Sequence, residues 1–108
     1  EPMPRSGTCS GMFTANTMAS IVEALGMSWP GQCSHVAVDE DNRPTSQKRQ
    51  DCRNAVAATF AMMKAGITAR DILTQKAFEN AATVQYAVGG STNAILQLID
   101  NNLVKLSI

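Results

Sequence analysis

Near the amino end of the chain, Cys9 has a setting that suits a metal ligand or a nucleophile. It lies between Gly7 and Gly11, and glycines let the backbone approach whatever the sulfur contacts. A helix expected to begin near Thr14 would place its positive end close to the thiol. Such a helix end favours the thiolate, which binds metal or attacks an electrophile. The alternative is a tight turn in which Cys9 is an inert small residue.

A second candidate site is the turn formed by residues 89–93. Two adjacent glycines before a helix expose backbone N–H groups at the positive end of the helix dipole, and this arrangement suits a carboxylate or phosphate group. The candidate anion-binding residues are Gly90, Ser91, Thr92 and Asn93. The alternative is an ordinary helix break with a serine or threonine cap.

The other thiols and the histidine have weaker claims to chemistry. Cys52 falls on the apolar side of an expected helix, and Cys33 falls in a loop as a surface thiol, so neither is expected to bind metal. His35 is the only histidine. Because the sequence gives it no paired acid or metal-spaced partner, we expect it to be structural or solvent-facing.

The composition indicates one small domain built mainly from helices. The chain has 108 residues, of which 44% are hydrophobic and only 5% aromatic, and this balance suits packed helices better than a sheet. Nine basic and nine acidic residues cancel without forming a basic stripe, so we expect no nucleic-acid partner. Three widely spaced cysteines favour a reducing compartment over a disulfide framework. No apolar run reaches the roughly 20 residues of a membrane span.

Hydrophobic spacing predicts four or five short helices and little strand. The expected helices cover about residues 14–25, 45–65, 69–72, 75–88 and 92–100. Glycines at 26, 66 and 89 are placed to end three of them. Polar and apolar residues alternate weakly at 34–38, which predicts a short strand. Residues 39–45 are predicted to form a polar loop, and residues 103–108 are predicted to be extended. The acidic residues of that loop are expected to be solvated rather than to bind a cation.

Side-chain patterns assign faces and starts to these helices. The inward face of the second helix is predicted to carry Cys52, Val56, Phe60 and Met63. The inward face of the fourth helix is predicted to carry Phe78, Ala81, Ala82 and Val88. In the first helix, hydroxyl and amide groups available for capping belong to Thr14, Asn16 and Thr17. The third helix is expected to begin with a capping box formed by Thr68 and Asp71. Thr74 is expected to cap the fourth helix, and Ser91 or Thr92 the fifth. Lys76 and Glu79 are spaced as a surface pair.

Three blocks of sequence resemble the dihydroxy-acid dehydratase family, which includes the phosphogluconate and sugar-acid dehydratases. They are residues 7–31, 70–81 and 88–96, in the family's order. The motif MFTANTM at residues 12–18 is closer to the branched-chain members than to the sugar-acid members. The resemblance implies that residues 1–108 are one partial domain, an internal fragment of the family's N-terminal domain, which is an α/β domain.

The resemblance also implies a function. Family members are hydro-lyases that convert 2,3-dihydroxy acids to 2-oxo acids, and in branched-chain amino-acid biosynthesis this step leads to valine and isoleucine. Cys9 stands at the position of one of three cysteines that hold an iron–sulfur cluster, and full-length members also use Mg²⁺. The chain lacks matches for the other two cysteines, for the magnesium ligands and for the serine proposed as base. No catalytic residue is therefore assigned, and we expect the chain to be inactive alone.

Two alternatives stay open beside this interpretation. The chain could be a non-catalytic helical interaction module derived from the family, or a fragment of a sugar-acid dehydratase. A weaker option is a small-anion binder that uses the turn at 89–93. For the full-length protein the resemblance implies a small dihydroxy acid as ligand, a homo-oligomer, and no membrane partner. It implies a cytoplasmic location in bacteria and a mitochondrial or plastid location in eukaryotes.

Overall fold

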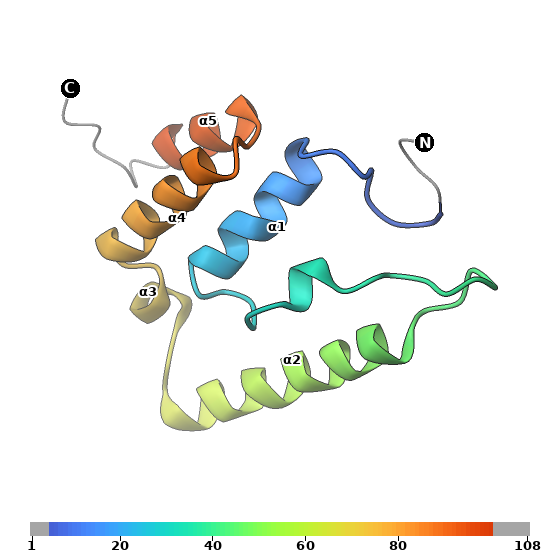
Figure 1. The fold of residues 1–108 in the computed structure, drawn as a ribbon. Coiled ribbons are helices and arrows are strands. Elements are labelled where there is room, and N and C mark those ends of the chain that lie inside the picture. The colour runs from blue at the N-terminus through green and yellow to red at the C-terminus, as the bar shows by residue number, and fades with distance from the viewer. Residues whose placement is uncertain (1–4, 101–108) are drawn as a thin grey trace.

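The computed structural model describes residues 5–100, which form five α-helices and one short 3-10 turn (Figure 1). No strand forms in this part of the chain, which confirms the prediction of a mainly α segment. In chain order the elements are α1 (Thr14–Ala24), η1 (Gln32–Ser34), α2 (Ser46–Ala65), α3 (Ala69–Ile72), α4 (Gln75–Ala87) and α5 (Thr92–Asp100).

The hydrophobic core lies where α1, α4 and α5 pack together. Successive turns of α4 and of α5 bring small and large apolar side chains into one cluster with α1, which contacts both of these helices. The buried members of the cluster are Ile21, Phe78, Ala81, Ala94 and Leu98. Because α2 contributes no buried residue, this three-helix cluster carries the hydrophobic stabilisation of the described chain.

Glycines end the first two long helices, as predicted. Gly26 has φ +85°, and its N–H donates to Glu23 O while Met27 N–H donates to Val22 O, both within 3.1 Å. This pair of bonds satisfies carbonyls at the end of α1 that have no partner within the helix. Gly66 has φ +70° and ends α2 in the same left-handed conformation.

Side-chain caps start the helices after α1. Thr45 accepts Lys48 N–H at α2, and Thr74 accepts Ala77 N–H at α4. At α3 the Asp71 carboxylate accepts both the backbone N–H and the hydroxyl of Thr68. These two bonds, the backbone bond first, lower the pKa of Asp71. The predicted capping is confirmed at α3 and α4, and the predicted start of α2 near Thr45 is confirmed as well.

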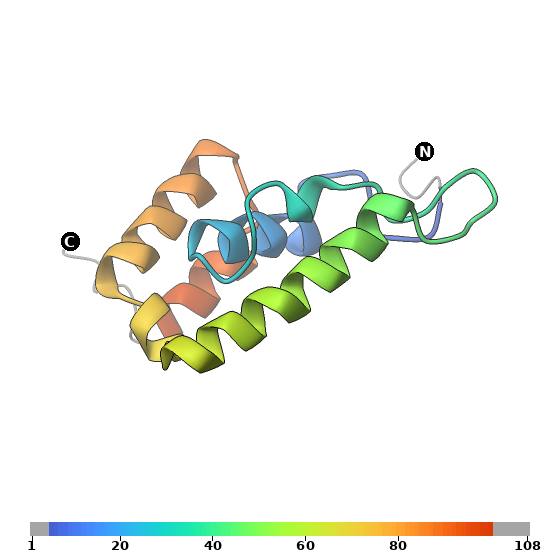
Figure 2. The ribbon, with the colours of Figure 1, turned by 90° about the horizontal axis from the view of Figure 1, so that it is seen from below.

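The predicted inward face of α2 is wrong. Cys52 is exposed, and the exposed fractions of Val56, Phe60 and Met63 are 57%, 60% and 68%. Figures 1 and 2 show α2 running along the side of the molecule opposite α4 and α5. The half-buried residues of α2 are instead Lys48, Asp51, Ala58 and Met62. At one end of this face Lys48 and Asp51 bind Gln32 and His35 through polar contacts. At the other end Ala58 and Met62 line a pocket together with apolar residues such as Met27 and Trp29.

Three smaller predictions also fail. Residues 34–38 do not form a strand, because Val38 pairs only with Pro44 across the 39–45 loop and no neighbouring strand extends the ladder. Val88 is 40% exposed, since it lies just past the end of α4. Within residues 5–100 the one ion pair joins His35 to Asp51, so Lys76 and Glu79 do not form the predicted surface pair.

Candidate functional site

The irregular segment that carries Cys9 is tied to α1 by the side chain of Asn16. Asn16 Nδ2 donates to the backbone oxygens of Cys9, at 2.7 Å, and of Gly11, at 2.6 Å. Its Oδ1 accepts the Thr8 hydroxyl at 2.9 Å. Cys9 is half-buried and forms no disulfide. The thiol therefore sits on a braced turn that leads into the positive end of a helix.

The polar side chains at the start of α1 do not cap that helix, contrary to the prediction. The N-cap residue is Phe13, and no side chain accepts a hydrogen bond from the helix end. Thr14 Oγ1 instead accepts Asn93 Nδ2 at 2.9 Å, and Thr17 Oγ1 accepts Ser91 N–H at 3.0 Å. Both hydroxyls thus bind residues that lie 79 and 74 positions further along the chain.

These contacts bring the two candidate sites to the same end of α1. The segment with Cys9 enters the helix there, and the turn between α4 and α5 docks on the first turns of the same helix (Figure 1). The sequence did not predict that the two sites lie together, because the hydroxyls of Thr14 and Thr17 were assigned to capping their own helix.

The turn at 89–93 is more closed than the predicted anion cradle. Four of its five backbone N–H groups already donate within the chain. Gly89 donates to Tyr86 O, Gly90 to Gln85 O, Ser91 to Thr17 Oγ1, and Asn93 to Ser91 Oγ. The last of these bonds confirms Ser91 as the cap of α5. Because these donors are occupied, the groups that face solvent are mainly the exposed side chains of Thr92 and Asn93.

Gln85, which the sequence analysis did not single out, supports this turn from inside the molecule. It is only 2% exposed, and its Nε2 donates to Ser91 O at 2.8 Å. Its Oε1 has no hydrogen-bond partner among the described residues. The Gln85 amide lies against Gly90, where a Cβ would overlap it and come within 2.7 Å of Thr17 Cγ2. The one signal in the sequence is that Gln85 follows Ala81 by four residues, on the buried face of α4.

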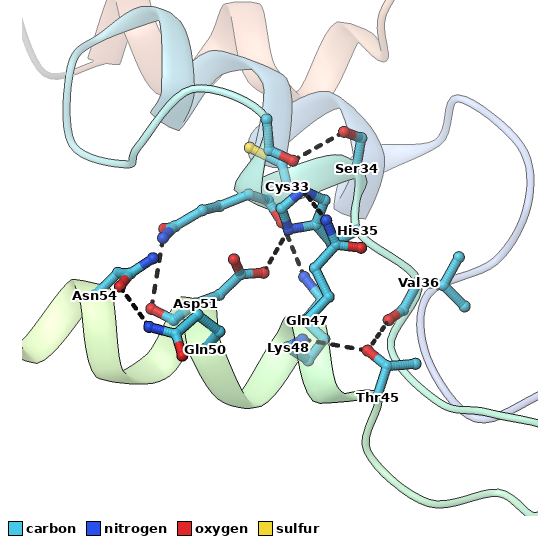
Figure 3. Close-up of polar contacts among 12 residues, drawn as sticks. Cys33, Ser34, His35, Val36, Thr45, Gln47, Lys48, Gln50, Asp51 and Asn54 are labelled. Atoms are coloured by element: carbon cyan, nitrogen blue, oxygen red, sulfur yellow. Dashed lines mark hydrogen bonds and ion pairs between the residues drawn. The ribbon is translucent and has the colours of Figure 1, made fainter.

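A second group of polar contacts joins η1 and the residues after it to α2 (Figure 3). His35 Nδ1 lies 2.6 Å from Asp51 Oδ2, and the other ring nitrogen contacts Gln47. Lys48 Nζ donates to Gln32 O at 2.9 Å. His35 therefore has the acid partner that the sequence did not reveal, and its role in the described chain is to hold α2 in place.

Cys33 joins this polar group to α1. Its Sγ lies 2.8 Å from Glu23 Oε2 and 3.0 Å from Ala19 O, and Glu23 Oε1 accepts Gly31 N–H at 2.8 Å. The Cys33 bond, followed by the Gly31 bond, lowers the pKa of Glu23. Burial, followed by the neighbouring carboxylate, raises the pKa of Cys33. Cys33 is therefore a half-buried hydrogen-bonded thiol rather than the surface thiol that was predicted.

The three cysteines do not assemble into one metal site. Cys33 and Cys52 both line a cavity of about 450 Å³ between α1, η1 and α2, whereas Cys9 lies on the segment before α1. Across residues 5–100, no group of three His, Cys, Asp or Glu side chains could hold a metal ion. Cys9 therefore lies apart from the other two cysteines, on the turn that Asn16 holds.

None of the helices within residues 5–100 is both long and apolar enough to cross a membrane.

Comparison with known proteins gives a consistent match over nearly the whole chain. The family model described as dihydroxy-acid/6-phosphogluconate dehydratase N-terminal matches residues 1–101. Dihydroxy-acid dehydratase 2 of Staphylococcus saprophyticus is 52% identical over 96 residues, which cover 89% of this chain and 16% of the relative. Dihydroxy-acid dehydratases of Mycobacterium sp. (strain JLS) and Mycobacterium leprae are 55% and 52% identical over 98 residues each, with the same coverage of both chains. The chain thus spans 16% of the length of these curated relatives. No solved structure matches it.

Proposed function

The chain belongs to the dihydroxy-acid/6-phosphogluconate dehydratase family, a family of hydro-lyases, and from that premise we propose that it is part of the N-terminal domain of an enzyme that dehydrates 2,3-dihydroxy acids. The observation that carries this proposal is the match over residues 1–101. The motif at residues 12–18 favours a substrate of branched-chain amino-acid biosynthesis over a sugar acid. The chain alone is proposed to be inactive.

In the proposed reaction a 2,3-dihydroxy acid loses the proton on C2 and the hydroxyl on C3 as water. The enol that results takes up a proton at C3 and becomes the 2-oxo acid. An iron–sulfur cluster with an open iron site would supply a Lewis acid for the leaving hydroxyl, and Mg²⁺ would bind the carboxylate end. No residue of this chain is assigned as the base.

The contribution of this chain is one cluster ligand and part of the surrounding wall. Cys9 fits a thiolate ligand because it is half-buried, free of disulfides and placed on a turn that Asn16 holds. The positive end of α1 would favour the negative charge of a ligated cluster. The exposed side chains of Thr92 and Asn93 would border the substrate, with Gly90 and Ser91 fixing the turn behind them.

A second candidate function follows from the exposed apolar stripe of α2, formed by Val56, Phe60 and Met63. A helical module that binds a partner chain would present such a stripe. Light scattering separates the two cases for the 108-residue chain. A monodisperse oligomer supports the interaction module, and concentration-dependent aggregation supports a dehydratase segment whose apolar surface lacks its cover.

A chimera tests the proposed function directly. The matching 96 residues of the S. saprophyticus relative are replaced by those of this chain, and the purified chimera is assayed anaerobically for iron, sulfide and formation of 2-oxo acid from a 2,3-dihydroxy acid. We expect an active, iron-loaded chimera, and a Cys9→Ser version that loses most of its iron. The matched control is Cys52→Ser, an exposed cysteine outside the site. Full iron content in the Cys9→Ser chimera would contradict the ligand assignment, and a folded but inactive chimera would contradict the proposed substrate class.

A further inference from the structure

We propose that Asn16 is a positioning residue that fixes the backbone turn presenting the Cys9 thiol. Its functional meaning rests on the proposed function, in which Cys9 is a cluster ligand. The structural claim is independent of that function, because it concerns how one side chain holds one turn.

The Asn16 amide is fully used by the segment before α1. Both oxygens that accept from Nδ2 belong to the turn, one from Cys9 itself and one from Gly11, two residues later. The distances of 2.7 and 2.6 Å are short for N–H···O bonds. The Thr8 hydroxyl binds Oδ1 from the residue before the cysteine and thereby fixes which way the amide faces. One side chain therefore holds the backbone at Cys9 and at Gly11 and also binds the Thr8 side chain before them.

The position of Asn16 in the helix supports the same conclusion. Asparagine is a poor helix former, and within a first helical turn it is normally explained by capping. Here the cap position is Phe13, and no side chain caps α1. An alanine at position 16 would favour the helix more, so the local benefit of Asn16 lies in the turn that it braces.

The neighbouring polar residues of α1 have a different task. Thr14 and Thr17 bind the turn before α5, at Asn93 and Ser91. Asn16, in contrast, is bonded to the segment that carries Cys9. Its replacement should change the Cys9 turn and leave the docking of α5 in place.

The first test measures thiol accessibility in the 108-residue chain. Alkylation by iodoacetamide is followed at each cysteine by peptide mass spectrometry, and exposed Cys52 serves as the internal reference. Loss of two hydrogen bonds should release the turn, so Asn16→Ala is expected to raise the Cys9-to-Cys52 rate ratio about fivefold or more. Thr8→Val, which removes only the orienting hydroxyl, should raise it less. The matched control is Asn54→Ala, which removes an exposed asparagine of α2.

An unchanged rate ratio in Asn16→Ala, with circular dichroism like that of Asn54→Ala, would overturn the proposal. If Asn16→Ala unfolds the chain, Thr8→Val decides the question, since Thr8 lies outside the helices and its substitution leaves the helix sequence intact. In that case a ratio equal to that of the unsubstituted chain overturns the proposal.

The second test uses the iron-loaded chimera and separates this inference from the proposed function. Asn16→Ala is expected to keep the fold but to shift the absorption spectrum and the midpoint potential of the cluster. It is also expected to lower the retained iron at least about twofold. The control Asn54→Ala should change neither the spectrum, nor the potential, nor the iron content. The positioning role alone would be overturned if Cys9→Ser loses its iron while Asn16→Ala keeps the same spectrum, midpoint potential and iron content as the unsubstituted chimera. Iron retained in Cys9→Ser would overturn the assignment of Cys9 as a cluster ligand in the proposed function, and the alkylation ratio would still decide what Asn16 does.

Discussion

Single polar side chains hold this molecule together at positions that apolar packing leaves open. Asn16 holds the Cys9 turn, Gln85 supports the turn before α5, and Glu23 joins α1 to the η1 segment. Each of them makes a hydrogen bond to a backbone atom of another segment. A substitution of Asn16 or Glu23 removes the partner of a backbone acceptor or donor, which costs more than the bond itself contributes.

Glu23 should make stability depend on pH. Its pKa is lowered in the folded chain by the Cys33 and Gly31 bonds, so its ionised form stabilises the fold above the ordinary glutamate pKa. That contribution is lost as the pH falls through the ordinary value toward the lowered one. Urea midpoints measured at neutral and acidic pH should therefore differ less in Glu23→Gln than in the unsubstituted chain. The control is Glu79→Gln, and an equal change in both variants would contradict the assignment.

Gly90 should tolerate no side chain. A Cβ there would overlap the Gln85 amide and Thr17 Cγ2, so Gly90→Ala is expected to lower the free energy of unfolding by about 1–3 kcal/mol through overpacking. Gly89→Ala is the matched comparison, because Gly89 has φ +62° but open space around it. Backbone strain alone should cost that variant about 1 kcal/mol. Equal denaturant midpoints for Gly90→Ala and the unsubstituted chain would show that the turn can move aside.

At the scale of elements, the helices divide into a packed group and a tethered one. The packed group, α1 with α4 and α5, buries the apolar cluster around Ile21. The tethered helix, α2, contacts the rest through polar bonds such as His35 to Asp51 and leaves a cavity of about 450 Å³ beside α1. An apolar side chain should therefore matter for stability in the first group and hardly at all on the exposed stripe of α2.

Two phenylalanines test this division with the same substitution. Phe78 in α4 is 4% exposed, and Phe60 in α2 is 60% exposed. Phe78→Ala is expected to cost about 3–5 kcal/mol, because it opens a cavity in the core. Phe60→Ala should change stability by about 0.5 kcal/mol or less, as for other surface positions. Thermal and urea unfolding measure both, and a large cost at Phe60 would mean that α2 packs in solution on a surface that it does not contact here.

At the scale of the whole molecule, the chain is flatter and more open than its length requires. The radius of gyration is 15.5 Å, against about 13 Å for a compact domain of this size. The principal extents of 49 × 40 × 18 Å reflect the placement of α2 along one side (Figure 2). The chain spans 16% of the length of the curated relatives that it matches.

Hydrogen exchange should reveal this openness. Amides of α1, α4 and α5 are expected to exchange only when the three-helix core opens, because their helices share the buried cluster. Amides of α2 should exchange faster by about tenfold or more, since local opening of this helix exposes no buried residue. Peptide-resolved mass spectrometry in neutral buffer measures both sets. Equal protection of α1 and α2 would mean that the whole chain unfolds as one unit.

The sequence by itself determined the helices, their ends and the family. Periodicity, glycines such as Gly26 and caps such as Thr74 act within a few residues, so local chemistry was enough to place these elements. The motif around Cys9 pointed to one ligand for the same reason. Only the tertiary structure decided which face of α2 is buried, how His35 and Cys33 are paired, and that Thr14 and Thr17 bind the turn before α5 rather than cap their own helix. These outcomes depend on groups far apart in sequence that compete for the same hydrogen bonds, and a local pattern contains no information about which competitor is near.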